Sequence, residues 1–390
     1  MFQGVSLDQA PPFEAPLLFF LTAPIFAIIG VLTALLDVGS FGVLHAFTIG
    51  FGGFVMIGAL QQMLPVVVGV KFDNPKRVST FTFIPLAIGT LLLIAALGFG
   101  QLGGAFIAAA LLLAALGGFG ALTLYKLFTA PRKSDTVIAM MLSLISLLIA
   151  TLLGVHLLTS IALGKELSFL LAHGSFALLG WVGLLIVGIS YQVVPMFYVT
   201  KEIPFKRLIA PLLFILIAAF TFSEKLPFFW LINALFFAYA LLLLWSLFKR
   251  KRSIKEPSIA FWQFGLVMLA AATFLPKPNQ TYLLLFGYGF AMSIIYGMLY
   301  KIIPFLSWFH TNSRGFFDVP TMKEMLDEKL AYIHLLLHMA ATLLLLFAPQ
   351  VAAGFIIAEN LIFYYIVKKP IAIYFEYKKR PSPLEAFKMP

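Results

Sequence analysis

Six histidines are the residues of this sequence best suited to hold a metal ion or a haem iron, because the chain contains no cysteine. Without cysteine it has no disulfides, thiolate metal sites, iron–sulfur ligands or the C-x-x-C-H attachment of a covalent haem. Imidazole nitrogens are therefore the strongest ligands left. The six residues are His45, His156, His173, His310, His334 and His338.

Two of these histidines occupy similar positions in two long apolar runs. His45 lies 20 residues before Pro65 and His173 lies 22 residues before Pro195. In helices their depths would differ by only about 3 Å. We predict that both bind a haem held between two neighbouring helices; the alternative for each is a hydrogen-bonded packing residue. His156 is better explained as packing.

Three histidines form a second group, toward the other side of the membrane. His334 and His338 are four residues apart and so share a helix face, and His310 ends the preceding apolar run. This arrangement suits one metal ion or a second haem. We assign His338 to cofactor binding and His334 and His310 to metal binding. For His310 and His334 the alternative is a side chain that reaches the membrane interface.

Two charged residues lie inside apolar runs. Glu359, followed by Asn360, is midway along the last run, and Lys301 is near the end of the tenth. Ionisable groups in the hydrocarbon region are costly and are therefore functional candidates. We predict a proton or polar path through both residues. The alternatives are a neutral, hydrogen-bonded acid at Glu359 and a Lys301 side chain that reaches the lipid headgroups.

The elements that position these residues are membrane helices. Of 390 residues, 62% are hydrophobic and 11% are charged, whereas a soluble domain carries about 25% charged residues. This excludes most soluble enzymes, nucleic-acid binders and secreted modules. A helix crosses the hydrocarbon core with about 20 apolar residues. Twelve such runs lie near 16–36, 41–70, 80–100, 104–128, 136–163, 167–199, 206–222, 227–248, 257–275, 280–308, 330–348 and 351–367.

Basic residues are divided unevenly between the two sides of the membrane. The loops after odd-numbered runs hold only Lys165, Lys225 and Lys277, and the other 24 of the 27 Lys and Arg belong to the opposite side. Cytoplasmic loops collect Lys and Arg. We therefore predict a multi-pass protein of a bacterial-type inner (plasma) membrane with both termini cytoplasmic. The net charge of +11 reflects this orientation and contact with anionic lipid, not a nucleic-acid partner.

The second, sixth and tenth runs share a pattern of glycine, aromatic, glycine, polar pair and proline. The first five positions stand 15, 14, 7, 4 and 3 residues before the proline, which is Pro65, Pro195 or Pro304. Such glycines let a backbone or a flat cofactor approach closely, and simple helix packing is the alternative. We predict a single transmembrane domain, an all-α bundle of about twelve helices with a pseudo-threefold repeat of four. The predicted parts are repeats near 16–128, 136–248 and 257–367, and a basic cytoplasmic tail at 370–390.

The second run resembles a helix of the catalytic subunit of haem–copper oxidases. Leu44 to Phe51, which reads LHAFTIGF and leads on to Gln62–Pro65, is similar to the helix that carries an early axial histidine there. The stretches Gly188–Phe197 and Gly297–His310 are similar to short single-subunit relatives, akin to haem membrane proteins of nitric-oxide stress. The resemblance implies a threefold bundle of twelve helices with both ends cytoplasmic.

The resemblance implies haem ligands but not the full set of cofactors that the oxidases bind. His45 matches the axial haem ligand and His173 is the candidate second ligand, for one or two haems b. The tenth run has no histidine before His310, the seventh has none, and His173 lacks the Pro-Glu and Tyr that follow it in the oxidases. A usual copper centre is therefore not expected.

The resulting functional prediction is a b-type haem protein of the membrane. It would act in electron transfer or in the binding or reduction of a diatomic gas, NO or O2, and whether it is an oxidoreductase stays open. Expected partners are the lipid bilayer, a quinol or cytochrome electron donor and further copies of the chain. The alternative is a membrane transporter or a structural subunit of a respiratory complex without haem.

Overall fold

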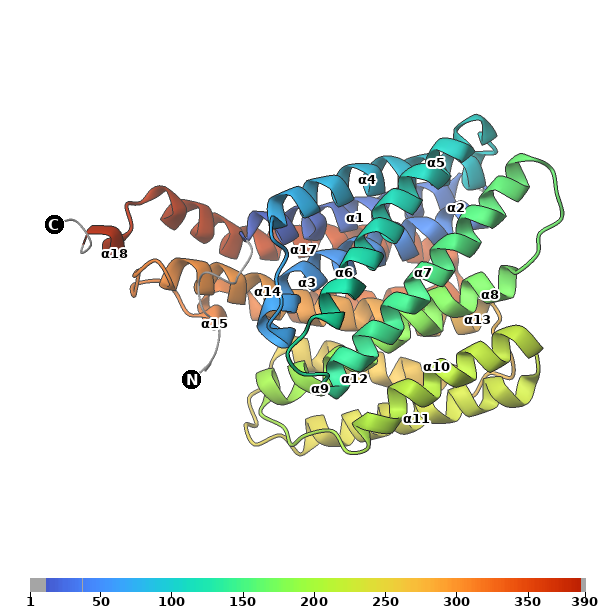
Figure 1. The fold of residues 1–390 in the computed structure, drawn as a ribbon. Helices are drawn as coiled ribbons and strands as arrows, with labels where there is room; N and C mark the ends of the chain where they lie inside the picture. The colour runs from blue at the N-terminus through green and yellow to red at the C-terminus, as the bar shows by residue number, and fades with distance from the viewer. Residues whose placement is uncertain (1–11, 37, 387–390) are drawn as a thin grey trace.

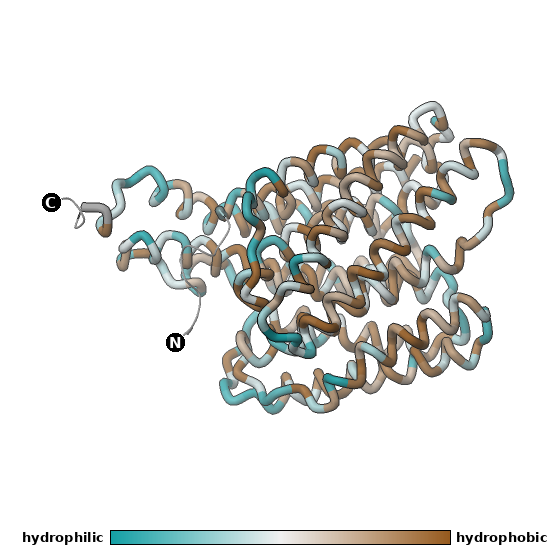
Figure 2. The backbone as a smooth tube through the Cα atoms, in the orientation of Figure 1, coloured by the Kyte–Doolittle hydropathy of each residue, from teal (hydrophilic) through white to brown (hydrophobic). Residues whose placement is uncertain are grey.

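The computed structural model describes residues 12–36 and 38–386, and this part of the chain is an all-α bundle without strands (Figure 1). Hydrophobic residues run along the helices, and hydrophilic residues gather in the loops at the two ends (Figure 2). The fold class therefore agrees with the prediction. The single-run helices are α1 (Glu14–Leu35), α4 (Pro75–Phe99), α7 (Asp135–Ala162), α10 (Lys206–Ser223), α11 (Leu226–Phe248), α12 (Pro257–Ala272), α15 (Met322–Met325), α16 (Glu328–Phe347), α17 (Pro349–Lys379) and α18 (Pro383–Ala386).

Four further spans are composite. The second combines α2 (Ser40–His45), η2 (Ala46–Gly53), α3 (Phe54–Met63) and η3 (Leu64–Val68). The fourth combines η4 (Leu102–Gly104), α5 (Ala105–Leu112), η5 (Leu113–Gly117) and α6 (Gly118–Phe128). The sixth combines α8 (Leu170–Ser175), η6 (Phe176–Gly183) and α9 (Leu184–Tyr198), and the tenth combines α13 (Gln280–Leu283), η7 (Leu284–Met292) and α14 (Ser293–Asn312).

Eleven helices in the described residues are long and apolar enough to cross a membrane, and they correspond to eleven of the twelve predicted runs. The ninth run forms α12, which has 16 residues. At 1.5 Å per residue this helix is only about 24 Å long, less than the roughly 30 Å of the hydrocarbon core. It starts at Pro257 and ends at Ala272, before the expected residue 275, because the chain turns at Thr273.

Large apolar side chains remain on the outside of the bundle. Phe81, Phe222 and Phe347 have exposed fractions of 75%, 80% and 83%. So much exposed apolar surface is unfavourable in water but suits contact with lipid tails. Together with the eleven candidate spans, this exposure identifies a multi-pass membrane protein in a lipid bilayer.

Three spans contain a π-helical segment at matching positions. The segments η2, η6 and η7 end at Gly53, Gly183 and Met292, in each case 12 residues before the proline of the shared pattern. A π-helix holds an extra residue per turn and is frequent at functional sites. The sequence analysis predicted regular helices here, so these segments are new.

The repeated glycines pack against the helix that precedes each of these spans in its predicted set of four. A Cβ on Gly188 would lie 2.5 Å from the Cβ of Ala139 in α7, and one on Gly180 would lie 2.6 Å from Ser146. The corresponding glycines of the second span meet α1, and those of the tenth meet α12. Close helix packing therefore explains these glycines without a cofactor. The pseudo-threefold arrangement of the whole bundle stays a prediction.

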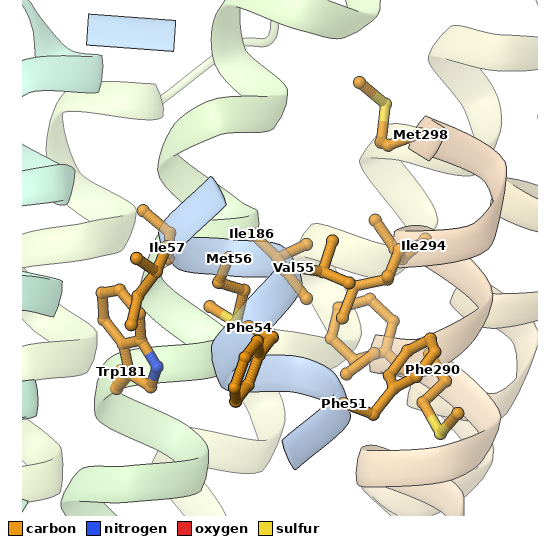
Figure 3. Packing of buried hydrophobic residues seen from close by; sticks show 14 of the residues in the cluster. Phe51, Phe54, Val55, Met56, Ile57, Trp181, Ile186, Phe290, Ile294 and Met298 are labelled. Carbon is orange, nitrogen blue, oxygen red and sulfur yellow. The ribbon is translucent and has the colours of Figure 1, made fainter. Parts of the chain in front are cut away.

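Apolar side chains fill the space between these three spans. Phe51 and Val55 of the second span lie close to Phe290 and Ile294 of the tenth (Figure 3). Trp181 and Ile186 of the sixth span approach from the other side (Figure 3). The polar side chains described below border this apolar centre, since the Tyr296 ring lies 5.1 Å from the Phe51 ring, centre to centre.

The predicted tail begins as helix. Residues 370–379 continue α17 through Pro370 to Lys379. The ends of α14 and α17, with α15 and α18, extend beyond the rest of the bundle (Figure 1). There Arg314 donates hydrogen bonds to the carbonyls of Tyr377 and Arg380, which caps the end of α17.

Candidate functional site

His45 and His173, which we call the histidine pair, face each other. His45 is the last residue of α2 and His173 lies in α8, each just before a π-helical segment. Their ring centres are 6.1 Å apart and their ring planes differ by 21°. Two histidines separated by 128 positions in the chain are thus brought together, as their similar depth suggested.

The hydrogen bonds of the histidine pair determine which ring nitrogens are free. Nδ1 of His45 is 2.7 Å from the carbonyl of Phe41, and Nδ1 of His173 is 2.9 Å from the carbonyl of Ala150 in α7. A carbonyl only accepts, so each Nδ1 carries the hydrogen and donates it. The Nε2 lone pair of each ring is left for a ligand, and no described residue forms a hydrogen bond with either Nε2.

Gly154 of α7 makes room for one of these rings. A Cβ at this position would lie 2.9 Å from Cε1 of His173 and 3.3 Å from its Nδ1. The sequence analysis did not single out Gly154, since no spacing distinguishes it from other glycines. His156, two residues along, is exposed and contacts Phe169, which agrees with a packing role.

A second cluster, the acid–histidine network, surrounds Glu359 of α17. Both Glu359 and His338 of α16 are fully buried, with an exposed fraction of 0%. Nδ1 of His338 lies 3.0 Å from Oε2 of Glu359. Tyr288 donates a hydrogen bond of 2.7 Å to Oε1, and the hydroxyl of Tyr296 is 3.4 Å from the same atom. The network also includes Ser293, Asn360, Tyr300 and His334.

His338 has no free nitrogen in this network. Its Nε2 lies 2.9 Å from the hydroxyl of Ser293, and its Nδ1 contacts Glu359. An axial haem ligand needs a nitrogen lone pair that no other partner occupies. In this structure His338 therefore belongs to the acid–histidine network, and its assignment to cofactor binding stays a prediction.

His334 and Tyr300 form the adjoining part of the network. Nδ1 of His334 is 2.5 Å from the Tyr300 hydroxyl, while its Nε2 is buried without a partner among the described residues. The His334 ring also meets the Tyr296 ring edge-on, with 4.4 Å between ring centres. One nitrogen of His334 is thus available to a small polar ligand such as water.

The predicted metal ligands are not gathered in one place. His310 packs against Phe13 and Tyr374, whereas His334 contacts Tyr296 and Tyr300. Within the described residues no three His, Asp or Glu side chains are placed to hold a metal ion. A metal role for His310 and His334 therefore stays a prediction without a third ligand in this part of the chain.

Lys301 lies outside the acid–histidine network. Its ammonium group forms an ion pair with Glu256, and both side chains are partly exposed. It also lies 5.7 Å from the centre of the Tyr198 ring. Lys301 follows Tyr300 directly, but consecutive side chains of a helix do not face each other, so this ion pair is separate from the network.

The tyrosines and Ser293 of the network were missed at the sequence level. Tyr288, Tyr296 and Tyr300 stand eight and four residues apart, which places them on one face of a helix. That spacing is the signal that could have found them. Only Tyr300 entered the sequence analysis, as part of the repeated pattern.

Comparisons with known proteins leave the chain without an assigned family: no family model and no curated protein sequence matches it. The candidate function therefore depends on the geometry of the histidine pair and of the acid–histidine network.

Proposed function

We propose that this chain is an integral membrane protein that binds a b-type haem between His45 and His173. Its role would be electron transfer or the binding or reduction of a diatomic gas. The observation that carries the proposal is the pair of neighbouring imidazoles, in which each Nδ1 donates to a backbone carbonyl and each Nε2 has no hydrogen-bond partner among the described residues.

The separation of the two rings suits an iron atom between them. Two metal–imidazole bonds of about 2 Å each place the bonded nitrogens about 4 Å apart. The ring centres then lie somewhat farther apart, in agreement with the observed 6.1 Å. A haem iron needs only two axial ligands from the protein. A metal that needs three or four protein ligands fits less well, because the described residues contain no such cluster.

The chain itself contributes orientation and shielding. The carbonyls of Phe41 and Ala150 fix the tautomer of the two rings and increase the basicity of Nε2. Gly154 provides the space that the His173 ring occupies. When bound, the haem would supply a one-electron redox centre, or a gas-binding site if one axial position opens.

The remaining parts of the proposal come from the sequence. A quinol or a cytochrome is the proposed electron donor, in a bacterial-type plasma membrane with both termini cytoplasmic. Further copies of the chain are proposed as partners. A copper centre is not proposed, since the histidine pair that binds copper in the oxidases is missing from the seventh run.

The test is an absorption spectrum of the purified protein after expression with a haem precursor. We expect a Soret band, and a reduced-minus-oxidised spectrum typical of two axial histidines. Replacing either ligand (His45→Ala or His173→Ala) should abolish or strongly change these bands, because each removes one axial nitrogen.

The exposed His156 provides the matched control. His156→Ala removes a histidine from the same region of the bundle without touching the pair, so its spectrum should equal that of the wild type. Folded wild-type protein that lacks a Soret band would overturn the proposal. It would favour a haem-free transporter or a structural subunit of a respiratory complex.

A further inference from the structure

We propose that Glu359 and His338 form a buried proton-binding site that exchanges its proton along Tyr296, His334 and Tyr300. The site is separate from the histidine pair and does not depend on a bound haem.

The hydrogen bonds around His338 require one proton between it and Glu359. The Ser293 hydroxyl donates its single hydrogen to the Gly289 carbonyl at 2.5 Å. Its oxygen therefore accepts from the Nε2–H of His338. In a neutral ring, Nδ1 then presents a lone pair to Oε2 of Glu359 at 3.0 Å. Two lone pairs at this distance would repel each other, so one proton lies between the two atoms.

The surroundings favour the neutral form of this pair. Tyr288 and Tyr296 face Glu359 from the tenth span, and Phe261 and Phe264 of α12 contact the His338 ring. The second span contributes only phenylalanine rings, which contact the two tyrosines. No lysine or arginine among the described residues pairs with Glu359. Because removing two charges from water can cost more than their mutual attraction returns, we place the proton on the carboxyl group.

Movement of this proton leaves the net charge of the pair unchanged. The O–H bond of Glu359 breaks as an N–H bond forms at Nδ1 of His338, which gives a carboxylate and an imidazolium. Tyr288 then donates its hydrogen bond to the carboxylate, and the Ser293 oxygen accepts one from the imidazolium. The same two hydroxyl groups that bond the neutral pair thus also bond the charged pair.

A column of polar groups connects this pair with Tyr300 in α14. The Tyr296 hydroxyl is 3.4 Å from Glu359, its ring meets His334, and His334 contacts the Tyr300 hydroxyl. A buried nitrogen without a protein partner, such as Nε2 of His334, normally takes a water molecule. That water would bridge the one step in the column without a direct hydrogen bond.

The column follows one helix over about one turn. From Tyr296 to Tyr300 it follows α14 for about 6 Å at 1.5 Å per residue. The next residue, Lys301, forms its ion pair with Glu256 on another side of α14, because consecutive side chains of a helix do not face each other. The column therefore ends at Tyr300.

The test is infrared spectroscopy of the full chain in lipid vesicles near neutral pH. Glu359 is the only buried acidic residue in the described part of the chain, so a protonated carboxyl band should come from it. We expect this band in the wild type, its loss in Glu359→Gln, and its shift in D2O as the proton exchanges. If Glu359→Gln does not fold, isotope-labelled glutamate in the wild type should shift the same band.

The route is tested by the rate of this exchange. Tyr300→Phe should slow the shift in D2O by about tenfold, the factor that corresponds to losing one hydrogen bond. Tyr191→Phe is the matched control. Tyr191 holds the same position in the repeated pattern, and its buried hydroxyl has no partner among the described residues. Its exchange rate should equal that of the wild type.

Two results would overturn the proposal. A wild type without a protonated carboxyl band, or with a band that survives in Glu359→Gln, excludes the proton site. A Tyr300→Phe variant that exchanges as fast as the wild type excludes the route. Neither result affects the haem proposal, which has its own spectral readout.

Discussion

The histidine pair and the acid–histidine network use the same side chain in opposite ways. In the pair, each imidazole binds one backbone carbonyl and keeps its second nitrogen free. In the network, both nitrogens of His338 are hydrogen-bonded to side chains, and the ring is fully buried. The first arrangement leaves a lone pair for an outside ligand, whereas the second holds a proton inside the protein. The hydrogen bonds of a histidine, rather than its depth in the membrane, separate the two roles.

The two regions also differ in how much the fold depends on them. The rings of the pair are partly exposed and join two helices near their ends. The network joins α14, α16 and α17 through side chains with exposed fractions of 0–6%. We therefore expect stability to respond strongly to changes in the network and cofactor binding to respond to changes around the pair.

The largest effect is expected from Glu359→Ala. It leaves His338 and Tyr288 with unpaired buried groups, and each buried polar group left without a partner costs about 1–3 kcal/mol. The loss of one neutral, partly exposed hydrogen bond in His45→Ala should cost only about 1 kcal/mol. Unfolding of both variants in the same detergent measures this difference. Equal losses of stability would remove the distinction between the two regions.

A smaller effect, confined to the pair, is expected from Gly154→Ala. The added methyl group would lie 2.9 Å from Cε1 of His173 and force the ring to move. A displaced ligand should weaken haem binding by about tenfold or more, with little change in unfolding. Haem titration of the purified apoprotein measures this loss.

Gly118→Ala is the control for that experiment. A Cβ at Gly118 would meet nothing within 4 Å, so haem affinity should stay unchanged. If both alanine variants bind haem like the wild type, the space at Gly154 does not serve the pair. The difference between the histidine pair and the acid–histidine network would then depend on His45 and His173 alone.

The smallest effect is expected at Glu324. Like Glu359 it accepts hydrogen bonds, but it is exposed, whereas Glu359 is buried. Hydrogen bonds from the backbone N–H and then the hydroxyl of Thr321 lower the pKa of Glu324 below its usual 4.5. A lowered pKa in the folded state means that this contribution is present above about pH 4.5 and is lost as pH falls through the folded pKa.

Glu324→Gln checks the sign of that dependence. The variant should lose slightly less stability than the wild type when the pH is lowered from neutral to acid, as measured by thermal unfolding at both values. A larger loss of stability at acid pH in the variant than in the wild type would contradict the lowered pKa of Glu324. A change as large as that of Glu359→Ala would show that burial is not what separates the two acids.

Much of the fold follows from the sequence because lipid imposes a simple rule on it. A run of apolar residues must form a helix to satisfy its backbone, so the positions of the helices were predictable. The length of α12 was not, because it depends on where the chain turns after Ala272. The π-helical segments were not predictable either. An extra residue in a turn is decided by packing between helices and leaves no periodic pattern in the sequence.

The candidate sites were predictable only where depth alone decides proximity. His45 and His173 have matching distances to their prolines, and the structure brings them together. The partners of Glu359 come from positions 21 and 71 residues away. Their contact depends on how α14, α16 and α17 are rotated about their axes, which hydropathy does not encode. For the same reason His338 was predicted as a ligand, although its neighbours occupy both of its nitrogens.

The π-helical segments determine the direction in which His45 and His173 point around the axes of their helices. In the second and sixth spans the histidine precedes the segment, and the closely packed glycines at Gly58 and Gly188 follow it. Deleting one residue within such a segment would restore α-helical winding and turn everything before it by about 100°. The imidazole would then point to a different side of the helix, while the packed half kept its place. The extra residue in each span thus sets the direction of the imidazole without changing how the rest of the helix packs.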